Sequence, residues 1–308
     1  MKGRTLRILL ALVLALLTMA PAPRASTIPT EDTFAKMPSS DPTTGLEAVE
    51  TDDGPTPQGK ITASESEPAI GNVIGHFTPP GGGWPVGLEH DGKGRLYLTE
   101  LISDTVFLID TSGAKISEFS YLPATRQGIG ITTDGTYIYL TDADDDEVNV
   151  YTLEGTFVSS FTVSGQSAFP EGITYNPATG HLYMVDGDTV HDFNGGDHIF
   201  EYTLSGTLVY TYPLASTSTD GIAYDPQRCS YWVYDSNSDT VTHYDLNFNV
   251  MEAFSGTIKA GFSAGEGVAV ITDILYVSAV YSNTIVAFDI AGAASACKRI
   301  YLPLVLRG

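Results

Sequence analysis

Short apolar runs alternate with turn residues along most of this chain. Within residues 130–161 the runs at 138–140, 148–151 and 157–161 are rich in β-branched and aromatic side chains, and Asp- and Gly-containing turns separate them. Runs of this length and composition are typical of strands joined in hairpins. We therefore predict that residues 130–161 form one four-stranded antiparallel unit.

The chain carries five copies of this unit. The first strand of each copy opens with a glycine followed by an aliphatic residue, at Gly87, Gly130, Gly172, Gly221 and Gly267. Successive glycines lie 43, 42, 49 and 46 residues apart, close to the roughly 40 to 50 residues of one β-propeller blade. The two-residue periodicity of the runs excludes a solenoid of helices. The predicted fold is therefore all-β, a β-propeller of four-stranded antiparallel blades.

The last copy lacks a fourth strand after Gly292, and the first residues of the repeat region supply one. The segment NVIGHF, residues 72–77, matches the fourth strands of the other copies. We predict that it pairs with the strand at 284–289 and completes the last blade, because such closure removes open sheet edges. This arrangement predicts five blades; six would require a blade in residues that are too few.

The two ends of the chain differ from the repeats. Residues 1–22 combine a basic start, an apolar run and a small-x-small cleavage site, which is typical of a secretory signal peptide. The run is short for a membrane span of about 20 residues, and an uncleaved anchor is the alternative. Residues 23–70 are acidic and rich in Pro, Ser and Thr, which predicts a disordered spacer. We assign 71–296 to the propeller and 297–308 to an apolar tail, either a packed strand or a sorting signal, and expect a secreted or cell-surface protein.

Charge narrows the range of partners. The formal net charge is -22, and loss of Lys2, Arg4 and Arg7 with the signal would make it -25. An acidic surface repels nucleic acid and anionic lipid and favours solubility and cation binding. We therefore expect no nucleic-acid partner and no membrane span in the mature chain. A monomer that binds a protein, a glycan or a small molecule is the expected state.

The chain has two cysteines, Cys229 and Cys297. Cys229 falls between the first two strands of copy four, and Cys297 follows the third strand of copy five, so both fall on one face of neighbouring blades. An exported protein meets an oxidising compartment, where a disulfide forms readily. We predict a Cys229–Cys297 disulfide, with two buried free thiols as the alternative.

The residue before each repeat glycine is the most informative position for chemistry. It is acidic in copies three to five, at Glu171, Asp220 and Glu266, and aliphatic in the first two, at Val86 and Ile129. Because this position begins the innermost strand, the three carboxylates should meet at one mouth of the central channel. Carboxylates held close together either share protons or bind a cation, and oxygen ligands favour Ca²⁺ over zinc. The alternative is three solvated turn residues without partners.

A second acidic group lies in the turn after the second strand of copy two. Asp142 ends that strand, as acidic residues do in three other copies, and side-chain capping of the hairpin is its expected role. Asp144 and Asp146 alternate on the same turn and are candidate Ca²⁺ ligands. This turn should open on the same face as the three carboxylates described above.

Copy three has the longest turn, residues 186–198. Long loops on a rigid scaffold often carry binding residues. The candidates for ligand binding there are Asp188, His191, Asp192 and His198. No spacing among them matches a strong zinc motif, and a mobile polar loop is the alternative.

The repeats resemble a known group of propellers. The segment beginning WPVGLEHDGKGRLYLTE is similar to the NHL repeat, and EGITYNPATGHLYMVD and DGIAYDPQRCSYWVYD resemble propellers of the gluconolactonase/senescence-marker type in the TolB-like superfamily. That resemblance implies a divalent metal that polarises an ester carbonyl, with Asp220 as a catalytic base and Glu171 and Glu266 as metal ligands. The Asn ligands of those enzymes are missing here. Those enzymes also have six repeats, whereas this chain has five.

Three functions are consistent with these features. The first is an exported, non-catalytic propeller that binds a ligand or protein on its acidic channel face. The alternative is a Ca²⁺-dependent hydrolase of lactone or ester type that uses the same acidic mouth. A structural surface module with calcium bound for stability alone is the third. No nucleophile elbow or phosphate-binding glycine loop supports another enzyme class.

Overall fold

The computed structural model of the chain describes residues 70–167, 169–187, 197–214, 216 and 218–297. The proposed signal peptide, spacer and apolar tail lie outside these residues, except for Ile70 at the end of the spacer and Cys297 at the start of the tail. Within the described part, no helix has the length and apolar character needed to cross a membrane.

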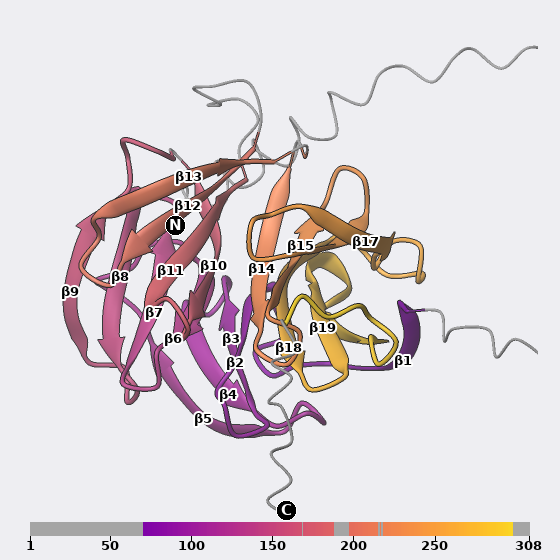
Figure 1. The fold of residues 1–308 in the computed structure, drawn as a ribbon. Coiled ribbons are helices and arrows are strands. Elements are labelled where there is room, and N and C mark those ends of the chain that lie inside the picture. The colour runs from indigo at the N-terminus through magenta and orange to yellow at the C-terminus, as the bar shows by residue number, and fades with distance from the viewer. Residues whose placement is uncertain (1–69, 168, 188–196, 215, 217, 298–308) are drawn as a thin grey trace, which may run out of the picture. The chain divides into compact units, whose positions relative to one another are not determined.

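Five four-stranded antiparallel sheets make up the described region (Figure 1). Blade 1 contains β2 (Pro85–His90), β3 (Leu96–Glu100), β4 (Thr105–Ile109) and β5 (Lys115–Ser120), and blade 2 contains β6 (Gly128–Thr133), β7 (Tyr137–Asp142), β8 (Glu147–Thr152) and β9 (Phe157–Thr162). Blade 3 contains β10 (Pro170–Asn176), β11 (His181–Asp186), β12 (His198–Thr203) and β13 (Leu208–Pro213), and blade 4 contains β14 (Thr219–Asp225), β15 (Ser230–Asp235), β16 (Thr240–Tyr244) and β17 (Val250–Ser255). The prediction of a five-bladed all-β propeller is confirmed.

Blade 5 combines the two ends of the described region. Its strands are β18 (Gly265–Ile271), β19 (Ile274–Ala279), β20 (Thr284–Asp289) and β1 (Asn72–Phe77), with the 3-10 turn η2 (Val280–Ser282) between β19 and β20. β1 pairs antiparallel with β20, from Asn72 opposite Asp289 to Phe77 opposite Ile285. The predicted closing strand and its partner are thus both correct.

Apolar side chains between neighbouring blades form the core. Each interface buries aliphatic and aromatic residues of the inner three strands, whereas the fourth strands are largely exposed. Trp232, for example, is fully buried between blades 4 and 5 and lies parallel to the ring of His243, with 3.9 Å between the ring centroids. The blades therefore hold one another in a ring, and no blade has a core of its own.

The repeat glycines allow the inner strands to approach closely around the channel. A Cβ at Gly130 would lie 2.1 Å from the carbonyl oxygen of Glu171 in the next blade, and one at Gly267 would lie 2.2 Å from that of Val86. Any larger residue would push two backbones apart. The resulting channel is narrow and has room for roughly one water molecule.

The predicted disulfide between Cys229 and Cys297 is present, with a Cα–Cα distance of 5.0 Å. It joins the β14–β15 turn of blade 4 to the segment that follows blade 5. The buried Arg228 guanidinium next to it donates to the carbonyl oxygen of Ile290 at 2.8 Å and to Asp273 at 2.6 Å. The disulfide and these bonds fasten the segment from Ile290 to Cys297 across the junction between blades 4 and 5.

Candidate cation site at the channel mouth

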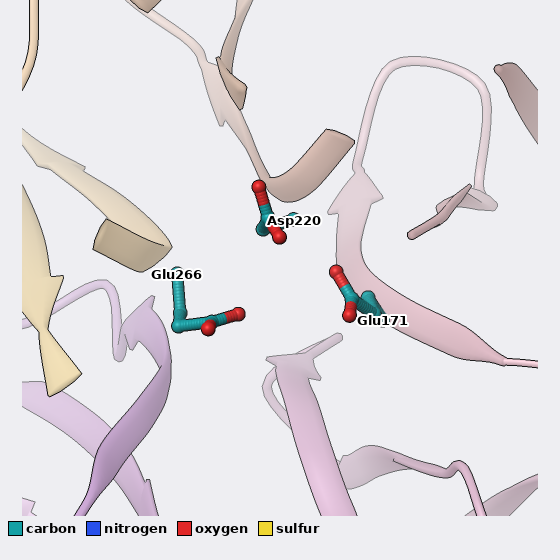
Figure 2. A group of neighbouring side chains, drawn as sticks. All are labelled: Glu171, Asp220 and Glu266. Atoms are coloured by element: carbon teal, nitrogen blue, oxygen red, sulfur yellow. The ribbon is translucent and has the colours of Figure 1, made fainter. Parts of the chain in front are cut away.

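Three carboxyl groups meet at one end of the channel. Glu171 of β10, Asp220 of β14 and Glu266 of β18 each place a carboxylate oxygen within 4.8 Å of the other two. Figure 2 shows the three groups turned toward one common space from three neighbouring blades. No other group of three potential metal-binding side chains occurs among the described residues.

A backbone irregularity shared by all five inner strands explains why these side chains meet. In every blade the register between the first and second strand shifts around the second residue of the inner strand, for example between Pro170 and Ile173 in β10 and between Thr219 and Gly221 in β14. An extra residue of this kind is a β-bulge, which bends the strand and re-aims a side chain. The residue before the repeat glycine lies in this bulge, so equivalent side chains from different blades gather at the channel mouth.

Glu171 and Asp220 are both buried, with 6% of each residue exposed. Asp220 accepts hydrogen bonds from the backbone N–H of Ser236 at 2.8 Å and from its hydroxyl at 3.1 Å. Glu171 lies against Gly187, where a Cβ would be 2.0 Å from its carboxyl carbon, and its Oε2 is buried without a hydrogen-bond partner. The alternative of solvated turn residues is therefore wrong for Glu171 and Asp220.

The close approach of the three groups changes their acidity. Burial, followed by the charges of Asp220 and Glu266, raises the pKa of Glu171 well above its usual range. Burial and the charge of Glu266 do the same to the pKa of Asp220, and burial raises the pKa of Glu266 to about 7. At neutral pH the apo cluster therefore retains protons, which a bound cation would displace.

The acidic residues that end the second strands have mainly a structural role. Asp142 accepts hydrogen bonds from the backbone N–H groups of Arg126, Gln127 and Asp144, at 2.8 to 3.1 Å. It thereby fixes the loop that enters β6 as well as its own hairpin. This confirms the capping role and places the Asp142 turn at the same end of the blade as the carboxylate cluster.

The other predicted ligands do not come together in the described structure. Asp144 and Asp146 belong to no group of three potential ligands, and Asp146 adopts a positive φ of 52° in its turn. His198 begins β12 and stacks on Phe200, with ring centroids 5.9 Å apart. Asp188, His191 and Asp192 lie outside the described residues, so their proposed binding role is untested.

Two residues that shape the site, Ser236 and Gly187, were not predicted from the sequence. Ser236 follows the acidic residue at the end of β15 and binds Asp220 across the hairpin. Gly187 occupies the equivalent position after β11 and leaves space for the Glu171 carboxyl group. The residue that follows the acidic end of the second strand is thus part of the channel mouth. In blades 3 and 4 this residue is small, and that was the feature of the sequence from which its place at the mouth could have been predicted.

Solved structures of other proteins share the fold of this chain. A crystal structure of Myxococcus xanthus glutaminyl cyclase superposes with a TM-score of 0.57 at 14% identity, covering 71% of this chain and 96% of that one. A chain of a nidogen/laminin complex gives 0.51 at 17% identity, covering 69% and 78%. These similarities establish the fold. The protein is a β-propeller.

Sequence comparison adds no closer relationship to this propeller. No protein-family model matches the chain, and no curated protein matches it either. A virginiamycin B lyase from Staphylococcus aureus is also similar in structure, with a TM-score of 0.45 at 17% identity, covering 67% of this chain and 66% of that one. Glutaminyl cyclase and the nidogen/laminin complex share the fold but differ in kind, so function must be argued from the site.

Proposed function

We propose that this propeller is an exported binding protein whose carboxylate cluster takes up a cation, and that Ca²⁺ is the inorganic cation it prefers. The observation that carries this proposal is the buried Glu171 carboxyl group, which has an unpartnered Oε2 and lies close to two further carboxyls. Burying acidic groups in this way is costly unless a positive charge compensates them. A cation at the mouth would supply that charge.

The donor set suits a hard cation. Glu171, Asp220 and Glu266 offer only oxygen ligands, which favour Ca²⁺ over zinc. Three side chains leave further coordination positions for water or for an oxygen of a ligand in the channel mouth. A bound divalent cation would polarise that oxygen, and the protein's own contribution is to hold the three carboxylates in place.

Binding without catalysis is the primary proposal, and hydrolysis of a lactone or ester is the alternative. One observation favours the alternative, because Asp220 is oriented by two hydrogen bonds from Ser236 whereas the Oε2 of Glu171 has no hydrogen-bond partner. Two nearby carboxyls of different environment can serve as base and acid. Calcium-dependent turnover of a lactone or ester series would select the hydrolase.

Isothermal titration of Ca²⁺ into the metal-free protein at pH 8 tests the proposal. We expect saturable binding that the double variant Glu171→Gln/Asp220→Asn abolishes. The matched control Asp144→Asn/Asp146→Asn removes two acidic groups outside the cluster and should bind as the wild type does. Absence of binding, or binding that only the control variant loses, would refute a cation site at the channel mouth.

Export is a further part of the proposal. It is supported by the basic and apolar start of the chain and by the disulfide, which is typical of oxidising compartments. Expression of the full chain in a secreting host should yield an extracytoplasmic product that begins near residue 23. An N-terminal sequence that still starts at residue 1 in the cytosol would contradict it. The ligand of the exported protein would be a protein, a glycan or a small molecule.

A further inference from the structure

The ring of side chains at the channel mouth has two unlike halves. The position before the repeat glycine is acidic in blades 3, 4 and 5, whereas blades 1 and 2 place Val86 and Ile129 there, with 2% and 5% of their surface exposed. Because the blades follow one another around the ring, the three acids adjoin and the two aliphatic residues adjoin. An inorganic ion would use the acidic half only.

Two aromatic side chains lie at the junction of blades 5 and 1, where the acidic and the aliphatic half meet. Trp84 lies two residues before Val86 at the entrance to β2, and Tyr281 lies on η2 after β19. Their ring centroids are 5.7 Å apart in an edge-to-face arrangement. Tyr281 is half exposed and packs on Trp84 across the junction of blades 5 and 1.

The aromatic pair borders the carboxylate cluster. Gly265, which precedes Glu266, pairs with Ala279 at the end of β19, and the N–H of Val280 donates to the carbonyl oxygen of Ala264. These bonds hold η2 beside the start of β18. Burial and the charge of Glu266 raise the pKa of Tyr281 to about 12, in agreement with this proximity.

The spacing of the carboxylates suits a primary ammonium group. Three oxygens within 4.8 Å of one another leave a central point no more than about 2.8 Å from each, which is the length of a charge-assisted N–H···O bond. A primary ammonium has three N–H donors, one for each carboxylate. The otherwise unpartnered Oε2 of Glu171 would receive one of them.

The surrounding charge also favours a cation. Asp186 and Asp235 end the second strands of blades 3 and 4, and their charges contribute to the raised pKa of Glu171 and Asp220 respectively. Negative potential focused at a narrow opening concentrates positively charged ligands. The aliphatic and aromatic side chains beside the carboxylates carry no charge. They can therefore contact only the uncharged part of a ligand whose cationic group lies among the carboxylates.

We propose that the channel mouth binds a primary organic ammonium ion, with its nitrogen among Glu171, Asp220 and Glu266 and its apolar body against Trp84 and Tyr281. This inference rests on the proposed cation site and names the class of ligand that the site takes. Ca²⁺ and the ammonium ion share the carboxylates, so each should weaken binding of the other.

The probes are 2-phenylethylammonium, methylammonium and 2-phenylethanol, each titrated calorimetrically into metal-free protein at pH 8. We expect the first to bind at least tenfold more tightly than the other two, since only it fills both halves of the mouth. Tyr281→Ala should weaken 2-phenylethylammonium binding about tenfold and leave Ca²⁺ binding unchanged. Tyr210→Ala is the matched control, because Tyr210 is similarly exposed, at 58%, on the outer strand β13.

The outcomes separate this inference from the proposed function. Ca²⁺ binding without 2-phenylethylammonium binding overturns the inference and leaves the cation site intact. Equal affinities for 2-phenylethylammonium and methylammonium, or an unchanged affinity in Tyr281→Ala, overturn the role of the apolar half. Failure of every cation to bind refutes both. Loss of 2-phenylethylammonium binding in Glu171→Gln, with the fold retained by circular dichroism, supports both.

Discussion

Replacing Glu266 by Gln should stabilise the metal-free protein at alkaline pH. Burial raises the pKa of this carboxyl to about 7 in the folded chain, above the ordinary 4.5. Between these two values the unfolded chain has released the proton while the folded chain still holds it. Stability contributed by the protonated group is therefore complete below about pH 4.5 and is lost as the pH rises through 7. Glutamine resembles the protonated acid and avoids that loss.

The size of the effect follows from the shift. A difference between about 7 and 4.5 corresponds to about 3 kcal/mol as an upper limit, at 1.36 kcal/mol for each pKa unit. Glu266 is only partly buried, so water screens part of this cost and we expect about 1 to 2 kcal/mol. For a domain of this size that is a rise of roughly 3 to 6 °C in Tm.

The assay is thermal unfolding in a chelating buffer from pH 4.5 to 8.5. Wild type and Glu266→Gln should melt together at the acidic end and separate as the pH rises, with the variant more stable. Saturating Ca²⁺ at pH 8.5 should reverse the order, since only the wild type keeps all three ligands. Glu154→Gln, at an exposed turn residue, is the control. If the Tm of the variant and the Tm of the wild type differed by the same amount at every pH, including pH 4.5, a raised pKa of Glu266 could not be the cause of the stabilisation.

Three further perturbations test the ring. Gly130→Ala should cost at least about 2 kcal/mol in urea unfolding, because its Cβ would overlap the Glu171 carbonyl oxygen; an effect no larger than that of Gly165→Ala, which has open space, would contradict this. Cys297→Ser should cost up to about 4 kcal/mol, since the disulfide spans 68 residues, and an unchanged Tm would show that the chain end adds no stability. Deleting residues 1–77 removes β1 and should make β20 sensitive to protease; equal resistance of the truncated and full chains would argue against closure by β1.

The fold was predictable because the repeat is carried by local signals. Glycine followed by an aliphatic residue marks each inner strand, and hairpin turns separate the remaining strands. The closing strand followed from one missing element, since a fourth strand absent after Gly292 had a matching segment at 72–77. Pairing at the ends of the ring is dictated by the need to satisfy both sheet edges. The pairing of two segments far apart in the sequence, 72–77 and 284–289, could therefore be predicted.

The site was only partly predictable. The position before the repeat glycine indicated that Glu171, Asp220 and Glu266 would converge, but not that the first two would be buried. Their burial depends on contacts across a hairpin, in which Ser236 bonds Asp220 and Gly187 leaves room for Glu171. Such contacts follow from bulge geometry and loop packing, neither of which a hydrophobic pattern specifies.

One feature of the repeat, a hydroxyl side chain near the end of the second strand, is missing or changed in the blades that carry Glu171 and Asp220. In blades 1, 2 and 5 a second-strand hydroxyl, from Thr99, Thr141 or Ser278, bridges the N–H of the repeat glycine and a carbonyl oxygen of the next blade. Blades 3 and 4 have Val185 and Tyr234 at that position. The Tyr234 hydroxyl donates to Asp239 and accepts from the N–H of Gly265 in blade 5, so it does not contact the N–H of its own repeat glycine. The hydroxyl bridge is thus replaced at the two junctions that join Glu171, Asp220 and Glu266. Local rules of a fold are most often broken at functional sites, so the altered junctions support the proposal that the acidic cluster on this side of the mouth is the binding site.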